Sequence, residues 1–110
     1  MAEDGWLRVG ALTELADESA ARLDLDDGAI CVARSNGNVY AVKDECSHGQ
    51  VPLSEGEVDD GFVECWMHGS RFDLVTGAPT GPPALTPVRV YPVRVVDGFI
   101  EIQLRAEAAT

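Results

Sequence analysis

The sequence predicts a small all-β protein, an antiparallel sandwich or barrel of roughly seven to nine short strands. Between turns, the residues either alternate apolar and polar side chains or are continuously apolar, as residues in strands do. A chain of 110 residues buries one modest core, so a single domain is expected over residues 1–110. Turn-forming residues recur at short intervals, as "DDG" (26–28), "SNGN" (35–38), "DDG" (59–61) and "VDG" (96–98).

The expected strands, in chain order, are 6–9, 21–25, 29–33, 39–43, 61–65, 88–96 and 99–104. The third of them, "AICVA", is continuously apolar, which predicts a strand buried on both faces. It is followed by Asn36-Gly37, a pair that tolerates the positive φ angles of a type I′ hairpin turn. Pro92 lies inside the sixth segment and has no amide donor, so that strand is expected at a sheet edge or at a bulge.

Two segments lack the composition of a strand. Residues 11–20 predict one short helical turn, which Thr13 could cap. Residues 77–87 contain four of the six prolines and predict a rigid, exposed loop without regular structure.

Charge and composition exclude several classes of partner. Eight basic and 19 acidic residues give a formal net charge of 8 − 19 = −11, which argues against binding to nucleic acid or anionic membranes. The longest apolar run is about five residues, against roughly 20 for a membrane span. Residues 1–10 lack a secretory signal pattern, and three cysteines are too few for a disulfide scaffold, so a cytoplasmic location is expected. A monomer is also expected.

Acidic residues are concentrated between positions 44 and 64, where no basic residue occurs. Such a run is compatible with a docking face for a basic partner, because complementary charge speeds encounter. More often such a run is only a solvated face that maintains solubility. The seven acids are Asp44, Glu45, Glu55, Glu57, Asp59, Asp60 and Glu64.

The two histidines of the chain, His48 and His68, each follow a cysteine within three positions, Cys46 and Cys65. Chance would produce both pairs under about 1% of the time. Thiolate and imidazole are ligands of iron and zinc. One structural zinc would accept this set, but zinc fingers usually draw a cysteine pair and a histidine pair from separate elements. Mixed pairs fit better with two metals, one bound by both thiolates and the other by both imidazoles.

This arrangement resembles the Rieske [2Fe–2S] signature, in "CSH" (46–48) and "CWMH" (65–68), followed by "GSRFD" (69–73) and "TG" (76–77). The resemblance spans about residues 5–105 and is nearest to the soluble ferredoxins of ring-hydroxylating oxygenase systems. It implies the Rieske fold, with a two-loop cluster-binding subdomain in about residues 44–85. It also implies one [2Fe–2S] cluster bound by Cys46, His48, Cys65 and His68.

The resemblance further implies which residues surround the cluster. Ser70 matches a serine that donates a hydrogen bond to a cluster sulfur in high-potential members, whereas Phe72 stands in the place of their tyrosine. Met67 and Gln50 stand where those members carry a disulfide. A midpoint in the lower part of the family's range, roughly −150 to +300 mV, is therefore expected.

Three further residues have expected roles. Pro82 lies in the proline-rich loop, which in the family covers the cluster. Trp66 is expected to shield the cluster from water, with docking of a partner as the alternative. Cys31 lies within a predicted strand and is interpreted as a core thiol.

The function implied is that of a one-electron carrier and not of an enzyme. The carrier takes electrons from a flavin-dependent ferredoxin reductase and passes them to a terminal, aromatic-ring-hydroxylating oxygenase. The chain cannot be the oxygenase itself, because both histidines are committed and none is left for a mononuclear iron site. Two alternatives stay open at this point. The chain could serve as an electron-transfer or sensor subunit of another redox system, or it could be a zinc-stabilised interaction module.

Overall fold

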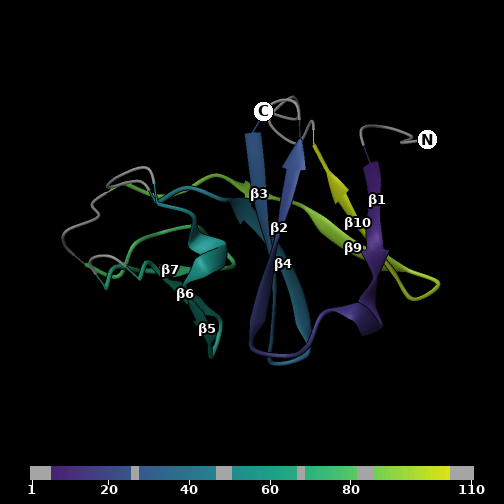
Figure 1. The fold of residues 1–110 in the computed structure, drawn as a ribbon, viewed down its shortest axis with the longest axis horizontal. Coiled ribbons are helices and arrows are strands. Elements are labelled where there is room, and N and C mark those ends of the chain that lie inside the picture. Colours follow the sequence, from purple (N-terminus) through teal and green to yellow (C-terminus); the bar gives the residue numbers. More distant parts are fainter. Residues whose placement is uncertain (1–5, 26–27, 47–50, 67–68, 82–85, 105–110) are drawn as a thin grey trace.

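The structure is a computed structural model that describes residues 6–25, 28–46, 51–66, 69–81 and 86–104 (Figure 1). These residues form strands and two short 3₁₀ turns, which confirms the all-β class. The elements are β1 (Trp6–Ala11), η1 (Leu12–Glu14), β2 (Ser19–Leu25), β3 (Gly28–Ser35), β4 (Asn38–Lys43), η2 (Leu53–Glu55), β5 (Glu57–Asp59), β6 (Phe62–Glu64), β7 (Arg71–Asp73), β8 (Val90–Tyr91), β9 (Val93–Val96) and β10 (Phe99–Gln103). No helix in this described part of the chain is long and apolar enough to cross a membrane.

The strands form three antiparallel sheets. The central sheet has the order β2-β3-β4-β8, and the other two have the orders β1-β10-β9 and β5-β6-β7. Figure 1 shows the central sheet between the other two, with β5–β7 on one side and β1, β9 and β10 on the opposite side. The fold is therefore a central sheet covered on two sides.

Strand β3 supplies side chains to two separate cores. Cys31 and Ala33 belong to the first core, together with residues from the β5–β7 side, whereas Ile30 and Val32 belong to the second core, together with residues of β10. Successive side chains of a strand point to opposite faces, so this alternation follows directly from the backbone. The prediction of a strand buried on both faces is confirmed.

The hairpin turns use residues that tolerate positive φ. Asn36 and Gly37 have φ of 52° and 81°, as a type I′ turn requires, which confirms the predicted hairpin between β3 and β4. The pair Asp60-Gly61 joins β5 to β6 and the pair Asp97-Gly98 joins β9 to β10 in the same way, with φ of 51° and 84°, and 53° and 82°.

Pro92 separates β8 from β9, so the single strand expected over 88–96 is two strands in different sheets. Each of the two is the edge strand of its sheet, because a proline cannot donate to a ladder on both sides. The edge position predicted from Pro92 is confirmed.

Three local predictions were incomplete or wrong. Strands β5 and β7 were not predicted, because each has three residues and such segments are too short to show a period. The helical turn is shorter than the segment 11–20 and spans Leu12–Glu14. Thr13 lies inside this turn, the N-cap position is Ala11, and no side chain caps it, so the expected Thr13 cap is wrong.

The carboxylate of Glu18 ties together three turns of the chain. It accepts hydrogen bonds from the backbone N–H of Asn36 (2.9 Å), the hydroxyl of Ser35 (2.8 Å) and the backbone N–H of Asp60 (3.0 Å). The Ser35 hydroxyl also accepts a hydrogen bond from the N–H of Gly61 at 2.7 Å. Glu18 and Ser35 therefore link the β3–β4 turn to the β5–β6 turn, and so the central sheet to the β5–β7 sheet.

Glu18→Gln is expected to reduce the acid sensitivity of the fold. The pKa of Glu18 lies below its ordinary value of 4.5, chiefly because of the N–H of Asn36 and then the hydroxyl of Ser35. A carboxylate with a lowered pKa stabilises the fold above pH 4.5, and this contribution is lost as the pH falls through the lowered pKa. Thermal unfolding measured between pH 3 and pH 7 should show a lower melting temperature for the variant at neutral pH and a shallower decline in acid.

Glu14→Gln is the control, because no hydrogen bond to the Glu14 carboxylate occurs among the described residues. An equally shallow acid profile in Glu14→Gln would contradict the role assigned to Glu18.

Candidate metal centre

The two cysteines of the predicted signature lie where strands end. Cys46 follows the end of β4 at Lys43, and Cys65 directly follows β6. Both are buried, with exposed fractions of 2% and 0%, and both belong to the first core. His48 and His68 lie outside the described residues, as do Gln50, Met67 and Pro82, so the expectations placed on them stay predictions.

Backbone hydrogen bonds fix the chain at each cysteine. The N–H of Cys46 donates to the carbonyl of Val51 at 2.8 Å, so the two ends of the segment 46–51 are held together. The N–H of Cys65 donates to the carbonyl of Ser70 at 2.7 Å, and the N–H of Gly69 donates back to the carbonyl of Cys65 at 2.9 Å. Each cysteine therefore begins a closed loop anchored in a sheet.

The surroundings of the two thiols suit a bound metal group. Both are packed with apolar side chains of the first core, including Leu53, Val63 and Phe72, and neither forms a disulfide. A thiolate in such surroundings is costly unless a positive charge compensates it. A group containing iron supplies that charge, so the two thiols fit the iron of an iron–sulfur cluster.

A match to a family model decides between the possible metal groups. The model of the Rieske [2Fe–2S] domain matches residues 5–92, which is most of the chain. The chain belongs to the Rieske [2Fe–2S] domain family. Its cofactor is one Rieske-type [2Fe–2S] cluster, which the resemblance in the sequence predicted correctly.

Several relatives of this Rieske domain are ferredoxins. The anthranilate 1,2-dioxygenase ferredoxin subunit of Burkholderia cepacia is 42% identical over 99 residues, covering 90% of this chain and 92% of the relative. The ferredoxin of carbazole 1,9a-dioxygenase from Nocardioides aromaticivorans IC177 has a TM-score of 0.82 at 36% identity and covers 88% of this chain and 95% of its own.

A second solved structure shows the fold in a complex. A chain in the complex of reduced oxygenase and oxidized ferredoxin in carbazole 1,9a-dioxygenase has a TM-score of 0.86 at 31% identity. The match covers 92% of this Rieske domain and 94% of that chain. The predicted fold class and the nearest group within the family, the soluble ferredoxins, are both confirmed.

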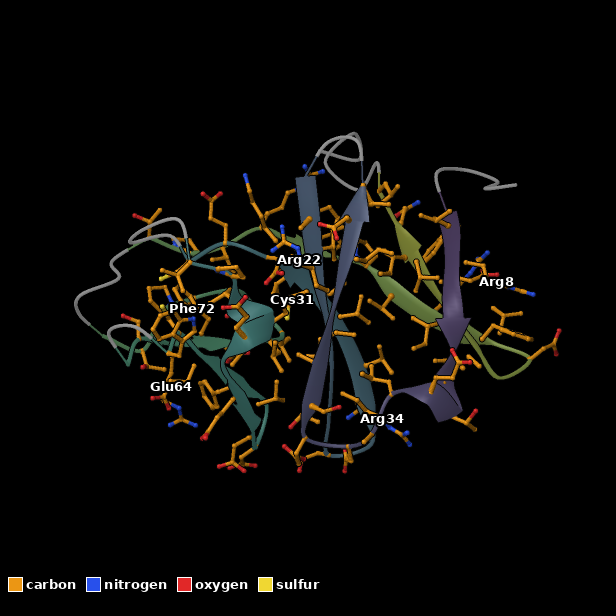
Figure 2. All side chains as sticks on the ribbon, in the orientation of Figure 1. Arg8, Arg22, Cys31, Arg34, Glu64 and Phe72 are labelled. Carbon is orange, nitrogen blue, oxygen red and sulfur yellow. The ribbon has the colours of Figure 1, made fainter. Side chains whose placement is uncertain are left out.

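Ser70, Phe72 and Trp66 differ in their exposure within the Rieske domain. Ser70 and Phe72 are buried, and Figure 2 shows Phe72 on the β5–β7 side of the molecule. Trp66 directly follows Cys65 but has an exposed fraction of 54%. Any shielding by Trp66 therefore uses less than half of its surface, and the rest is open to a partner.

The proline-rich segment is tied to β7 near its start, and its far end is tied back to Gly77. The N–H of Asp73 donates to the carbonyl of Ala78 at 2.9 Å, and the N–H of Thr80 donates to the carbonyl of Arg71 at 2.8 Å. At the far end, the N–H of Val88 donates to the carbonyl of Gly77 at 2.9 Å. The predicted rigidity therefore has a basis in hydrogen bonds as well as in proline content. Pro82 itself lies between these anchors, outside the described residues.

Cys31 lies inside a strand of the central sheet of the Rieske domain. It is fully buried in β3, as Figure 2 also shows at the central sheet. Burial raises the pKa of its thiol far above the usual range, and the nearby carboxylate of Asp44 raises it further. The neutral thiol is the stable form, which agrees with the interpretation of Cys31 as a core residue.

The acidic run 44–64 is not one continuous face. Asp44 is buried, whereas Glu55, Glu57, Asp59 and Asp60 are exposed. Glu57 lies directly opposite Glu64 in the β5–β6 pair, which places like charges side by side on one sheet. Cross-strand like charges are unfavourable, but Glu64 also lies opposite Arg71 in the β6–β7 pair, which offsets this repulsion.

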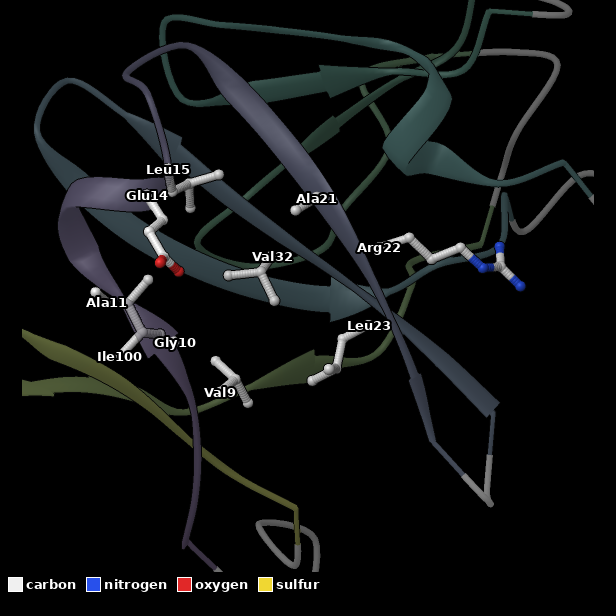
Figure 3. A pocket seen from close by; sticks show the side chains of 10 residues that line it. All are labelled: Val9, Gly10, Ala11, Glu14, Leu15, Ala21, Arg22, Leu23, Val32 and Ile100. Carbon is white, nitrogen blue, oxygen red and sulfur yellow. The ribbon is translucent and has the colours of Figure 1, made fainter.

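An apolar hollow lies on the second-core side of the central sheet. This cavity of 180 Å³ opens between β1 and β2, with Val9, Leu23 and Ile100 among its walls (Figure 3). The carboxylate of Glu14 points into it, whereas the guanidinium of Arg22 points away. Its walls include members of the second core, so it is separate from the metal centre.

Gly77→Ala is expected to destabilise the segment that carries the proline-rich loop. Gly77 has a φ of 79°, and an added Cβ would overlap the carbonyl oxygen of Val88. Strain of this kind costs about 1–3 kcal/mol. Denaturant unfolding of the variant should show this loss, with faster release of iron on addition of a chelator.

Gly81→Ala is the matched control in the same loop. Its φ is not in the left-handed region, and no atom of the described residues lies within 4 Å of an added Cβ. The control should unfold within about 0.5 kcal/mol of the wild type. A Gly77→Ala protein as stable as the control would contradict the close packing described for the loop ends.

Proposed function

We propose that the chain is the ferredoxin component of a ring-hydroxylating oxygenase system, and that it carries single electrons from a flavin-dependent ferredoxin reductase to a terminal oxygenase. The observation that carries this proposal is the similarity to the anthranilate 1,2-dioxygenase ferredoxin subunit, which extends over nearly the full length of both chains. The likeness to a chain in an oxygenase–ferredoxin complex supports the oxygenase as partner. The reductase is inferred, because such a carrier needs an electron donor.

The proposed ligands of the cluster are Cys46 and Cys65 for one iron and His48 and His68 for the other. When bound, the cluster takes up and releases one electron, at a potential that histidine ligation raises. The chain's own contribution is to bury both thiols among apolar side chains and to hold their backbone amides in closed loops. This favours the metal-bound thiolates over solvated ones and keeps water from the sulfur side of the centre.

The partners are proposed to approach near Trp66. Its ring is more than half exposed and belongs to the residue next to Cys65, so a protein that covers this ring lies close to the centre. Tryptophan is enriched at the centre of protein interfaces. With a net charge of −11, the chain attracts partners with basic docking faces over the distance that salt leaves unscreened.

The remaining expectations belong to the same proposal. Residues 1–110 form one Rieske domain, with the cluster-binding loops in about 44–85, and Pro82 and Ser70 lie close to the cluster. The protein acts as a cytoplasmic monomer. The cytoplasmic location is supported by three cysteines that form no disulfide.

Cysteine variants test the ligand set. Purified wild-type protein should contain about two irons and two sulfides per chain, and its reduced form should give the rhombic EPR signal of a Rieske centre. Cys46→Ser and Cys65→Ser should lose both, because each removes a thiolate. Cys31→Ser should keep the cluster, although a buried hydroxyl in the core costs about 1–3 kcal/mol of stability. Loss of the cluster in Cys31→Ser at a temperature where it is folded would contradict the assignment.

Stopped-flow reduction tests the role as a carrier. With NADH and a flavin-dependent ferredoxin reductase, the protein should accept one electron per chain and be reoxidised by a ring-hydroxylating oxygenase with substrate. Both rates should fall by roughly tenfold between low and high salt, because the encounter is steered by charge. Cys46→Ser is the control and should transfer nothing. A reduced wild-type protein that no such oxygenase reoxidises would favour another redox system as the client.

A further inference from the structure

Asp44 is a buried acid close to the metal centre with no part in the ligand set. It lies two residues before Cys46, and the exposed fraction of its side chain is 0%. Burying a charged carboxylate costs several kcal/mol unless it is paired and hydrogen-bonded. An acid that persists in such a place therefore has to be held by specific donors.

The donors to the carboxylate come from two elements, and the backbone of Asp44 is bonded to a third. The backbone N–H and the hydroxyl of Ser54, in η2, each donate to the Asp44 carboxylate at 2.6 Å. The guanidinium of Arg22, in β2, donates at 3.1 Å. The backbone N–H of Asp44 itself donates to the carbonyl of Ala29, in β3, at 3.0 Å. The carboxylate thus connects η2 and an edge strand of the central sheet to the end of β4.

These bonds close the loop that contains Cys46. Asp44 lies at the start of this loop and Ser54 at its end. The hydrogen bonds from Ser54 to the Asp44 carboxylate therefore hold the two ends of the loop together. Leu53, next to Ser54, is fully buried in the same core as Cys46. Val51 also lies in this core, and its carbonyl accepts the N–H of Cys46. A displacement of Ser54 therefore reaches Cys46 through two neighbouring core residues and one hydrogen bond.

Arg22 balances the charge of Asp44 from the solvent side. Its side chain is 44% exposed and also donates to the exposed carboxylate of Asp24 at 2.8 Å. It lies at an open hollow of 330 Å³ that Lys43 and Pro52 also line. Figure 2 shows Arg22 near Cys31, its cross-strand partner in the central sheet. The Asp44 carboxylate is therefore on the buried side of the pair, two residues from Cys46.

We infer that Asp44 is a positioning residue for the electron-transfer centre. Its carboxylate accepts both hydrogen bonds from Ser54, closes the loop that contains Cys46, and holds Cys46 for metal binding. Its negative charge also contributes to the midpoint potential, because a nearby negative charge disfavours the addition of an electron. This inference rests on the proposed function, in which Cys46 is a ligand of the cluster.

Three variants test the hydrogen bonds between Asp44 and Ser54. Asp44→Asn removes the charge, Ser54→Ala removes one of the two Ser54 bonds, and Ser54→Thr keeps the hydroxyl. Hydrogen bonds to a charged carboxylate are stronger than those between neutral groups. The half-life of the cluster in the presence of a chelator should therefore fall about tenfold in Asp44→Asn and by a smaller factor in Ser54→Ala. Ser54→Thr should retain the wild-type half-life. The midpoint should rise in Asp44→Asn.

Glu101→Gln is the matched control. Glu101 is a nearly buried carboxylate that accepts hydrogen bonds from two arginines, Arg8 at 2.9 Å and Arg94 at 2.7 Å. It lies in β10, on the side of the central sheet opposite to β5–β7 (Figure 1). The same change of charge there should lower the melting temperature but leave the midpoint and the EPR signal unchanged.

The outcomes separate this inference from the proposed function. If the wild-type protein holds no iron–sulfur cluster, the proposed function fails. If the wild type holds it and Asp44→Asn shows the wild-type half-life and midpoint, only the role of Asp44 is overturned. That role is also overturned if Glu101→Gln shifts the midpoint as much as Asp44→Asn. Amide hydrogen exchange without the cluster gives an independent reading, because Ser54 should lose protection in Asp44→Asn and keep it in Glu101→Gln.

Discussion

The structure depends on one constraint, which is that strand β3 is buried on both faces. Its alternate side chains supply two cores, and these two cores are what hold the outer sheets against the central one. A shift of one residue in its pairing would move Cys31 and Ala33 into the place of Ile30 and Val32. The neighbours β2 and β4 fix the register along nearly the full length of β3, so this shift is strongly opposed.

The first core also defines the environment of the metal centre. The thiols of Cys46 and Cys65 share it with Cys31, so one apolar region contains two proposed ligands and one inert thiol. Their difference comes from position and not from burial. Cys31 lies inside a ladder, where its backbone is fully paired with both neighbours, whereas the other two start loops. A cysteine that starts a loop can share a metal group with a residue of a second loop, whereas Cys31 is held inside the central sheet.

Much of the fold followed from local chemistry. The burial of β3 on both faces, the Asn36-Gly37 turn and the edge position at Pro92 each follow from a short local stretch of the chain, and each prediction was confirmed. The division into two strands at Pro92 was not predicted. The three-residue strands β5 and β7 escaped prediction because their pairing is decided by distant parts of the chain. The spacing of cysteine and histidine led to the correct family, while the positions of His48 and His68 stay predictions.

Asp44 and Glu18 show why the supporting residues of the site could not be predicted. In the sequence, Asp44 opens an acidic run and reads as a surface residue, and its donors lie 10 and 22 positions away. Glu18 makes one of its bonds across 42 positions. These sequence separations follow neither the period of a helix or strand nor a sequence motif. Only the pairing of the strands brings these donors together.

The bonds of Glu18 and Ser35 between two sheets have a consequence for electron transfer. An electron moves fastest between centres whose surroundings need little rearrangement when the charge changes, and preorganised dipoles meet this condition. The β5–β7 sheet is held to the central sheet by the shared first core and also by hydrogen bonds at its far turn. Within the described residues the central sheet and the β5–β7 sheet thus form one connected frame, which limits their rearrangement relative to each other at each transfer.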